Sequence, residues 1–284
     1  MATLQAEQAL LRPMLRGDLE AAVELSTEQG WPHRIEDWTL FFALGEGIVA
    51  ERDGRILGTI MAWKFGSDMA SVGLVIVTNA AQGTGLGTQL LTAMLARLDG
   101  RTVMLNATAE GLPLYAKFGF VEVGQVYQHQ GPAPVMPLAE LQQGERIRPI
   151  GGADDCLASM YSQAEGIDRA ALFATLADKG RTVVLTRADQ PVGFAMLRRF
   201  GRGWSVAPII APDLGGAKAL ASHWLAAKAG SFCRLDVTAD SGLSPWLEDL
   251  GLPRVGSVVT MVRGTAPQPA GEAKVFAIAA QALG

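Results

Sequence analysis

The 284-residue sequence contains very few side chains that could form disulfides or bind a metal. Cys156 and Cys233 lie far apart and outside any CxxC pair, so the disulfide framework of a small secreted protein is not expected. His33, His129 and His223 are scattered, and neither their mutual spacing nor a neighbouring cysteine fits a zinc site. No metal site is therefore predicted.

Excess charge of one sign and long apolar runs are also missing. The formal net charge is −4 and the pI about 5.5, so we expect no nucleic-acid-binding surface. No apolar run approaches the ~18 residues that cross a bilayer, so no membrane partner is expected. Residues 1–7 have no basic or apolar signal region, which favours a cytoplasmic protein. The composition, 49% hydrophobic and 18% charged, is typical of a soluble globular chain with one large or two medium domains.

What the sequence does have is a glycine-rich stretch, QGTGLG at residues 82–87, between two segments of different periodicity. Residues 72–77 before it are apolar and rich in β-branched side chains, which predicts a buried strand. Residues 88–98 after it carry apolar side chains at helical spacing. A glycine loop at a helix N-terminus leaves backbone N–H groups unpaired where the helix macrodipole also favours an anion. We therefore predict a pyrophosphate cradle.

Two nucleotide-binding folds also use glycine loops, but both fit this stretch less well. The spacing G-x-G-x-G is not the G-x-G-x-x-G of a dinucleotide fold, and no G-K-(S/T) follows as in a P-loop. A dinucleotide loop also follows the first strand of its unit, whereas about eighty residues precede this one. A simple glycine-rich turn between strand and helix stays open on the local pattern alone.

The remaining first half predicts an α+β order of elements. Asp53-Gly54 is a two-residue hairpin signal between two predicted strands. The pattern predicts strands at 11–14, 48–52, 56–63, 72–77, 102–106 and 121–127, and helices at 18–28, 35–44, 88–98 and 112–119.

The pattern then begins again at an offset of roughly 132 to 136 residues, which indicates an internal repeat. Residues 147–150, 182–193 and 246–252 repeat 11–14, 48–58 and 114–120 respectively. We therefore predict two copies of one unit, with domains at 1–143 and 144–284. Residues 275–278 are apolar and are expected to dock as a last strand.

The two predicted copies differ at the glycine loop. The second loop, residues 211–216, is shorter and lacks the Gln-x-x-Gly-x-Gly spacing, and its Asp213 is expected to act as a helix N-cap. Leu247 stands at the position that matches Tyr115. We therefore expect the first copy to carry the function and the second to be structural and to lack the acyl-CoA loop.

Two motifs in the first half resemble the GCN5-related N-acetyltransferase (GNAT) superfamily. The family's acyl-CoA signature, (R/Q)-x-x-G-x-(G/A), matches residues 82–87, and its later L-Y-x-K-x-G-F matches LYAKFGF at 114–120. The second half resembles the divergent C-terminal GNAT-like domain of two-domain members. Asn79 stands where the family often has Pro, and Thr108 where an Asn often precedes the tyrosine helix. The resemblance implies tandem GNAT-like α+β domains, each with a mixed, mostly antiparallel central sheet flanked by helices.

The resemblance also implies acetyl-CoA as co-substrate and an N-acetyltransferase that acts on a primary amine of an unidentified small-molecule or peptide acceptor. A CoA-binding sensor or scaffold without turnover is the alternative. Tyr115 is the implied acid for the leaving thiolate. A phenol pKa near 10 against a thiol near 8.5 puts full proton transfer uphill by roughly 2 kcal/mol. The residues implied in cofactor binding are Val75, Ile76, Val77, Gln82, Gly83, Thr84, Gly85, Leu86, Gly87 and Thr88.

The acceptor side carries less specific signals. In this family the region between the first helices often shapes the acceptor site, so a possible aromatic wall consists of Trp31, His33, Trp38 and Phe41. At helical spacing, Trp38 and Phe41 are equally consistent with ordinary core. Candidate bases for the amine are Glu46, Asp68 and Glu110, each of which is also explained as a solvated surface carboxylate. The duplication is compatible with a monomer that forms a pseudo-dimer, or with a homodimer.

Overall fold

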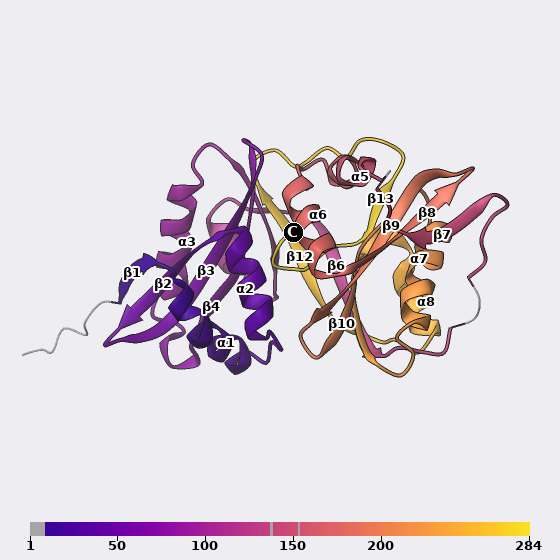
Figure 1. Ribbon diagram of the computed structural model, residues 1–284. Coiled ribbons are helices and arrows are strands. Elements are labelled where there is room, and N and C mark those ends of the chain that lie inside the picture. The colour runs from indigo at the N-terminus through magenta and orange to yellow at the C-terminus, as the bar shows by residue number, and fades with distance from the viewer. Residues whose placement is uncertain (1–8, 137–138, 153) are drawn as a thin grey trace, which may run out of the picture.

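The computed structural model describes residues 9–136, 139–152 and 154–284, and within these residues the strands form one mixed 13-stranded sheet (Figure 1). The strand order is β1-β2-β3-β4-β5-β12-β6-β11-β13-β10-β9-β8-β7. Most neighbouring strands are antiparallel, and helices flank the sheet, so the expected α+β class is confirmed.

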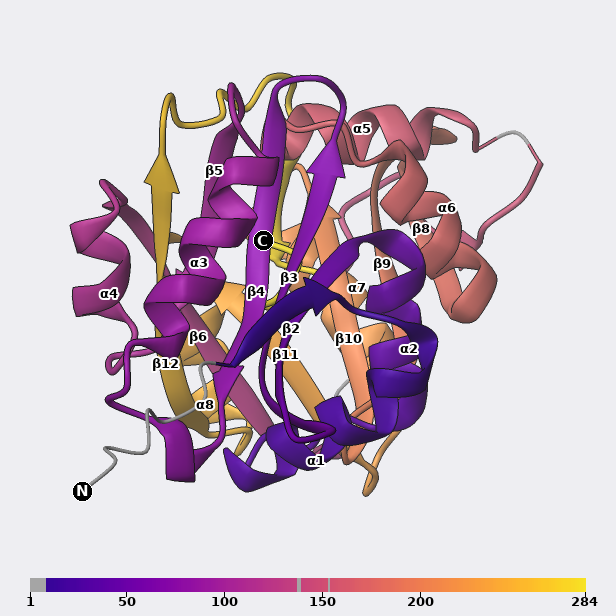
Figure 2. The same cartoon turned by 90° about the vertical axis from the view of Figure 1, so that its left-hand side faces the viewer.

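The first half follows the predicted order of elements. The glycine loop lies between a short 3-10 turn, η2, and the long helix α3. In order, the elements are β1 (Leu10–Pro13), η1 (Arg16–Asp18), α1 (Leu19–Glu28), α2 (Ile35–Leu44), β2 (Glu46–Arg52), β3 (Arg55–Phe65), β4 (Met69–Val77), η2 (Asn79–Ala81), α3 (Leu86–Arg97), β5 (Thr102–Ala107), α4 (Leu112–Lys117) and β6 (Val121–Pro132). Figure 2 shows α3 and α4 on one side of these strands and α1 and α2 on the other.

The second half repeats this order and adds one strand. Its elements are β7 (Glu145–Pro149), α5 (Cys156–Glu165), α6 (Ala170–Lys179), β8 (Arg181–Arg187), β9 (Gln190–Phe200), β10 (Gly203–Ala211), α7 (Leu214–Ala226), β11 (Phe232–Thr238), η3 (Ala239–Ser241), α8 (Leu243–Asp249), β12 (Arg254–Arg263) and β13 (Lys274–Ala277). The extra strand is β13, so the expectation of a last strand in this segment is confirmed. None of the helices in the described residues has the length and hydrophobicity that a membrane span requires.

Each half of the chain has an equivalent ion pair near its start, as expected for an internal repeat. Arg12 binds both carboxylate oxygens of Asp18 through Nη1 and Nη2, at 2.7 and 2.8 Å. Arg148 binds Asp154 in the same way, at 2.6 and 2.7 Å. In each pair the arginine holds the pKa of the carboxyl below its ordinary value. Such agreement in geometry supports the predicted duplication, because the two pairs lie at equivalent positions of the two copies.

The two halves exchange strands at the centre of the sheet. Strand β12 of the second half lies between β5 and β6 of the first, and β6 pairs on its other side with β11. The side chain of Met261 on β12 is consequently part of the first-half core, together with Leu105 and Phe120. The predicted boundary at 143/144 stays a prediction, but the hydrogen-bonded sheet runs across it.

A pair of parallel strands separates in each half. Strands β4 and β5 pair only over residues 69–71 and 102–104, and then splay apart. The register of β4 against β3 shifts just beyond this point, and Leu74 takes a positive φ of 51° while its carbonyl accepts a hydrogen bond from Thr59 Oγ1 at 2.8 Å. This bulge places the unpaired edge of β4 beside the glycine loop and positions the candidate site.

Candidate functional site

The glycine loop has the geometry of an anion cradle. Gly83 and Gly85 have φ values of 74° and 85°, a left-handed conformation that favours glycine. Gly85 is the N-cap of α3, and the N–H of Gln89 is the donor that bonds to its carbonyl, at 3.0 Å. The N–H groups of residues 86–88 precede that first helical hydrogen bond, so they are the ones left for a ligand.

Hydrogen bonds from side chains hold this loop in place. Glu28, at the end of α1, accepts a hydrogen bond from the Asn79 backbone N–H at 2.8 Å. Gln82 Nε2 donates to Asn79 Oδ1 at 3.1 Å, and Thr84 Oγ1 donates to the carbonyl of Ala81 at 2.7 Å. Asn79, a departure from the family pattern, therefore braces the loop instead of disturbing it.

A cavity of about 780 Å³ runs from this loop along the open edge of β4 to α4. Its lining residues are Gln29, Trp31, Val72, Gly73, Leu74, Val75, Ile76, Val77, Ala81, Gln82, Gly83, Gly85, Leu86, Gly87, Thr88, Asn106, Thr108, Glu110, Gly111, Leu114 and Tyr115. All residues proposed for cofactor binding are thus brought together in one cavity except Thr84, whose hydroxyl is turned to Ala81.

Tyr115 lines this cavity and is largely shielded from solvent. Only 9% of it is exposed, and its ring packs edge-on against Phe120 at a centroid distance of 6.0 Å. Burial raises the pKa of Tyr115 to about 12, so the phenol is protonated at neutral pH. Against a thiol pKa of ~8.5, full proton transfer is then uphill by roughly 3.5 units or about 5 kcal/mol. This is more than the sequence predicts, because an isolated phenol is not desolvated.

A second, smaller cavity of about 170 Å³ adjoins the first. The two share Trp31, Gly73, Leu74, Asn106 and Thr108 as lining residues. Beyond this junction, the small cavity is lined by Gly30, Pro32, His33, Phe41, Gln128, Gln130, Phe200, Arg202, Arg234, Val258, Ala280, Gln281 and Ala282. Much of its wall therefore comes from the second half.

Three of the four residues expected in an aromatic wall line this small cavity: Trp31, His33 and Phe41. Trp38 does not reach it, because its ring is fully buried and its Nε1 donates to Ser26 Oγ at 3.0 Å. The same Ser26 Oγ lies 3.2 Å from His33 Nδ1. Burial lowers the pKa of His33 to about 4, with nearby Arg234 as a further cause, so the imidazole is neutral at pH 7.

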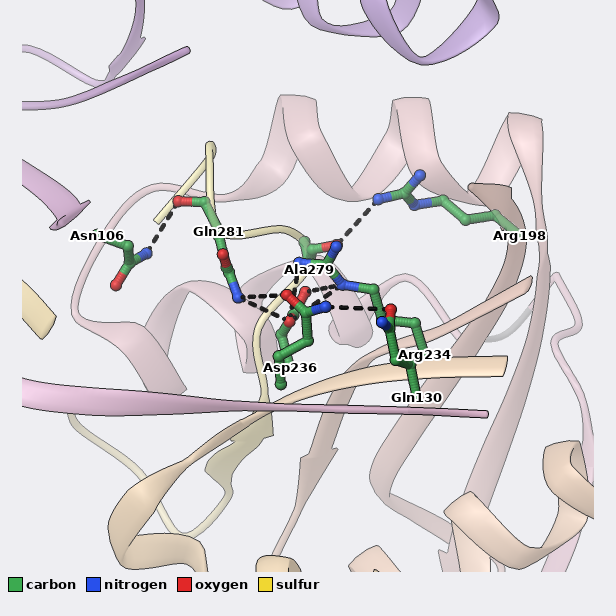
Figure 3. A network of polar contacts seen from close by, with 8 residues as sticks. Asn106, Gln130, Arg198, Arg234, Asp236, Ala279 and Gln281 are labelled. Atoms are coloured by element: carbon green, nitrogen blue, oxygen red, sulfur yellow. Dashed lines mark hydrogen bonds and ion pairs between the residues drawn. The ribbon is translucent and has the colours of Figure 1, made fainter. Parts of the chain in front are cut away.

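The residues after β13 close the small cavity through a polar network (Figure 3). Asn106 Nδ2 donates to the backbone carbonyl of Gln281 at 3.0 Å, and Gln281 Nε2 donates to Asp236 Oδ1 at 3.0 Å. Gln281 Nε2 also lies 3.3 Å from Gln128 Oε1. A Cβ on Gly73 would lie 2.8 Å from the carbonyl oxygen of Ala282, so a glycine is required where this segment crosses β4.

The candidate bases lie in different surroundings. Glu46 forms ion pairs with Lys64 at 2.6 Å and Arg97 at 3.7 Å and does not line either cavity. Asp68 lies in the turn between β3 and β4, also outside both cavities. Glu110 lines the large cavity, and hydrogen bonds from its own backbone N–H and from Thr108 lower its pKa. Among these three, Glu110 alone is placed near the junction. In the described part of the chain, no group of three or more His, Cys, Asp or Glu side chains is arranged to hold a metal ion.

The equivalent position in the second half is filled by the protein itself. Asp213 Oδ1 accepts a hydrogen bond from the Gly216 N–H at 2.8 Å, and its Oδ2 lies 3.1 Å from Arg187 Nη2. Strand β13 occupies the gap where β10 and β11 separate, so that Ala277 is paired with both Ile209 and Val237. Leu247, at the position of Tyr115, is fully buried.

Comparisons with known proteins agree with this description. Sequence models of acetyltransferase (GNAT) domains match residues 20–135 and 158–277. An uncharacterized N-acetyltransferase of Bacillus subtilis strain 168, YitH, is 27% identical over 269 residues, which cover 92% of this chain and 94% of that protein.

Among solved structures, a GCN5-related N-acetyltransferase from Sphaerobacter thermophilus aligns with a TM-score of 0.66 and 16% identity, covering 93% of this chain and 97% of that one. A tandem GNAT protein from the clavulanic acid biosynthesis pathway aligns with a TM-score of 0.63 and 13% identity, covering 93% and 100%. At these identities the structures show a shared fold.

Proposed function

From the premise that the chain is a two-domain member of the GNAT superfamily, we propose that it transfers the acetyl group of acetyl-CoA to a primary amine. The observation that carries this proposal is the pair of joined cavities. One runs from an anion cradle to Tyr115, and the other adjoins it, with five lining residues in common. A donor and an acceptor can therefore enter separately and meet at Gly73, Leu74 and Asn106.

The first half would bind the donor. The pyrophosphate of acetyl-CoA would accept hydrogen bonds from the N–H groups of residues 86–88 at the start of α3. The pantetheine arm would lie along Val75 and Val77, whose side chains line the large cavity, and would use the backbone edge that β4 leaves unpaired where it splays from β5. We assign residues 1–143 this catalytic role and residues 144–284 the role of a wall for the acceptor.

The proposed reaction uses side chains that line the large cavity. The amine nitrogen attacks the thioester carbonyl carbon, a C–N bond forms, the C–S bond breaks, and the amine loses a proton. Tyr115 is neutral at the start of the reaction and would donate a hydrogen bond to the sulfur as negative charge develops there, passing its proton to the sulfur only as the C–S bond breaks. For a lysine-like amine, prior deprotonation at pH 7 costs on the order of 4–5 kcal/mol. We assign Glu110, which lines the large cavity, as the carboxylate that would receive that proton, directly or through water.

The test is release of the CoA thiol from acetyl-CoA in the presence of a panel of primary amines, with the acetylated product identified by mass spectrometry. We expect release that depends on both the amine and the protein. Acetyl-CoA binding by calorimetry without release for any amine would instead support a CoA-binding sensor. No binding at about millimolar acetyl-CoA, where a Kd of 1 mM corresponds to only about −4 kcal/mol, would contradict both.

A further inference from the structure

The charged side chains that line the small cavity are positive. Its charged lining residues are Arg202 and Arg234, and none of its lining residues is Asp or Glu. His33 also lines the cavity, and its imidazole is neutral at pH 7 because burial lowers its pKa. The other polar groups of the lining are mainly the amides of Asn106, Gln128, Gln130 and Gln281. A cavity with this lining is complementary to an anion.

Asp236 holds the side chain of Arg234 in place where it lines the cavity. The Nε of Arg234 lies 3.0 and 3.1 Å from the two carboxylate oxygens of Asp236, and its Nη2 lies 3.0 Å from Oδ1. Asp236 also accepts a hydrogen bond from Gln281 (Figure 3), and it is not among the residues that line the cavity. The carboxylate therefore fixes the orientation of Arg234, while the guanidinium still forms part of the wall.

Arg198 adds positive charge from behind this wall. It is 2% exposed, and its Nη2 donates to the carbonyl of Ala279 at 3.0 Å. Its Nε and Nη1 have no hydrogen-bond partner in the part of the chain that the structure describes. The guanidinium carbons of Arg198 and Arg234 lie 4.6 and 5.4 Å from the ring centroid of Phe200, which lines the cavity. A buried cation with unmet donors is costly, and a bound anion nearby would offset that cost.

Arg202 lies at the rim, on a turn that is anchored to the other half. It is exposed and follows Gly201 in the turn between β9 and β10. The N–H of Gly201 donates to Asp37 Oδ2 at 2.9 Å, and Asp37 is itself buried on α2. This contact fixes the position of the turn relative to α2, so Arg202 stands at a defined distance from the junction.

We propose that the acceptor is a small amine that also carries a carboxylate, with a free amino acid as its simplest form. This rests on the proposed function. The carboxylate is bound by Arg202 and Arg234, which line the small cavity but not the large one, and the amine points to the shared residues where the thioester lies. The volume of about 170 Å³ is well below the ~300–1,000 Å³ of pockets for larger ligands, which favours an acceptor of this size.

The experiment compares L-amino acids with their carboxamides and their decarboxylated amines, in which the amine is kept and the carboxylate is lost. Turnover is measured with acetyl-CoA, and binding is measured by calorimetry with and without CoA. We expect kcat/KM and affinity to favour the preferred amino acid over its carboxamide by about 10-fold or more, the range of charge-assisted hydrogen bonds. Aminophosphonates form a further arm, and a preference for them would overturn the carboxylate assignment.

A pair of arginine variants tests the residue assignment. R202Q should raise KM for the amino acid by about 10-fold, leave KM for the carboxamide within about 2-fold, and leave the Kd for acetyl-CoA unchanged. R199Q is the matched control: Arg199 is also exposed, and its guanidinium carbon lies 4.3 Å from the Trp204 ring, outside the cavity. Thermal melting of both variants verifies that they fold.

The two proposals fail in different ways. Turnover of neutral amines with no advantage for the carboxylate, or an R202Q variant with unchanged KM for the amino acid, would overturn the carboxylate acceptor and leave the acetyltransferase intact. Absence of turnover with every amine would count against the acetyltransferase. In that case the calorimetric comparison still decides the acceptor question, because equal or no binding of amino acid and carboxamide would overturn the carboxylate site.

Discussion

The two halves of the molecule share one order of strands and helices. The gap between their separated parallel strands, however, is open in the first half and filled in the second. In the first half, β4 and β5 separate after Ser71 and the cavity that follows is open. In the second half, β10 and β11 separate after Ser205, and β13 fills the gap with backbone pairing on both sides. Strand β13 thus fills, in the second half, the gap that corresponds to the open cavity of the first half.

The helix N-termini beside these gaps also differ, in whether their backbone N–H groups are available to a ligand. In the first half, glycines leave the N–H groups of residues 86–88 available. In the second half, the Asp213 carboxylate takes up the corresponding N–H of Gly216 and pairs with Arg187. The second half has instead contributed Arg202, Arg234 and Gln281 to the small cavity. The two copies thus keep one scaffold while the surroundings of their helix N-termini differ.

The largest expected effect comes from separating the halves. Residues 1–143 alone lack β12, which pairs with both β5 and β6 and places Met261 in the first-half core. We expect this fragment to show no cooperative melting transition by circular dichroism and no acetyl-CoA binding. Co-expression with residues 144–284 should restore a complex that purifies as one species. Cooperative melting of the isolated fragment would show that the exchanged strand is dispensable.

Next in size is the effect of removing the Tyr115 hydroxyl. In Y115F the ring still packs against Phe120, but the neutral hydroxyl that we propose as donor to the thioester sulfur is lost. We expect kcat to fall by about 10²-fold or more, with KM for acetyl-CoA nearly unchanged. Y127F is the control, since Tyr127 lies on β6 outside both cavities. Equal turnover by Y115F and wild type across the pH range would remove Tyr115 from the mechanism.

A smaller effect is expected from a methyl group at the anion cradle. In G87A the new Cβ would lie 3.7 Å from Leu114, an ordinary contact, and Gly87 does not have the positive φ that makes substitution of Gly85 ambiguous. The methyl should hinder the approach of the pyrophosphate and weaken acetyl-CoA binding by about 10-fold, or 1.4 kcal/mol.

G215A makes the same change at the equivalent place in the second half, where the Cβ would lie 3.3 Å from Asp213 Oδ1. It should bind acetyl-CoA like the wild type. If G215A weakened binding as much as G87A does, the functional difference between the two helix N-termini would be refuted.

A further effect, on stability instead of binding or turnover, concerns His33, whose ring lies between the halves, 5.7 Å from that of Phe200. Its pKa is lowered to about 4 in the folded protein, so between its ordinary value near 6.5 and 4 the unfolded chain binds the proton more strongly. The free energy of unfolding should therefore fall as the pH drops through this window, by about 1–3 kcal/mol from this residue. Urea unfolding of wild type and H33Q at pH 7 and pH 5 should show a shallower pH dependence for H33Q, and identical slopes would contradict the assignment.

Sequence analysis predicts the features that depend on neighbours in the chain. The strand, glycine loop and helix around residues 82–87, the duplicated order of elements and the strand at 275–278 all follow from local periodicity and turn residues. The structure adds that the pKa of Tyr115 rises because the surrounding core excludes water, which no motif reveals.

Features that depend on the choice of strand partner could not be predicted. Arg234 reaches the small cavity because β11 pairs with β6, so that Arg234 lies opposite Gln130, a contact set by register across the two halves. Helical spacing likewise places Trp38 and Phe41 on one face of α2 without deciding which reaches the cavity. The packing of α2 against α1 and Phe200 determines that Phe41, and not Trp38, lines the cavity.

The most direct test of the difference between the halves is the stoichiometry of acetyl-CoA binding by calorimetry on the full chain. We predict one molecule bound per chain, with affinity reduced in G87A and unchanged in G215A. Two molecules bound per chain with similar affinity would show that β13 and Asp213 do not close the second site, and would contradict the proposed division of roles between the halves.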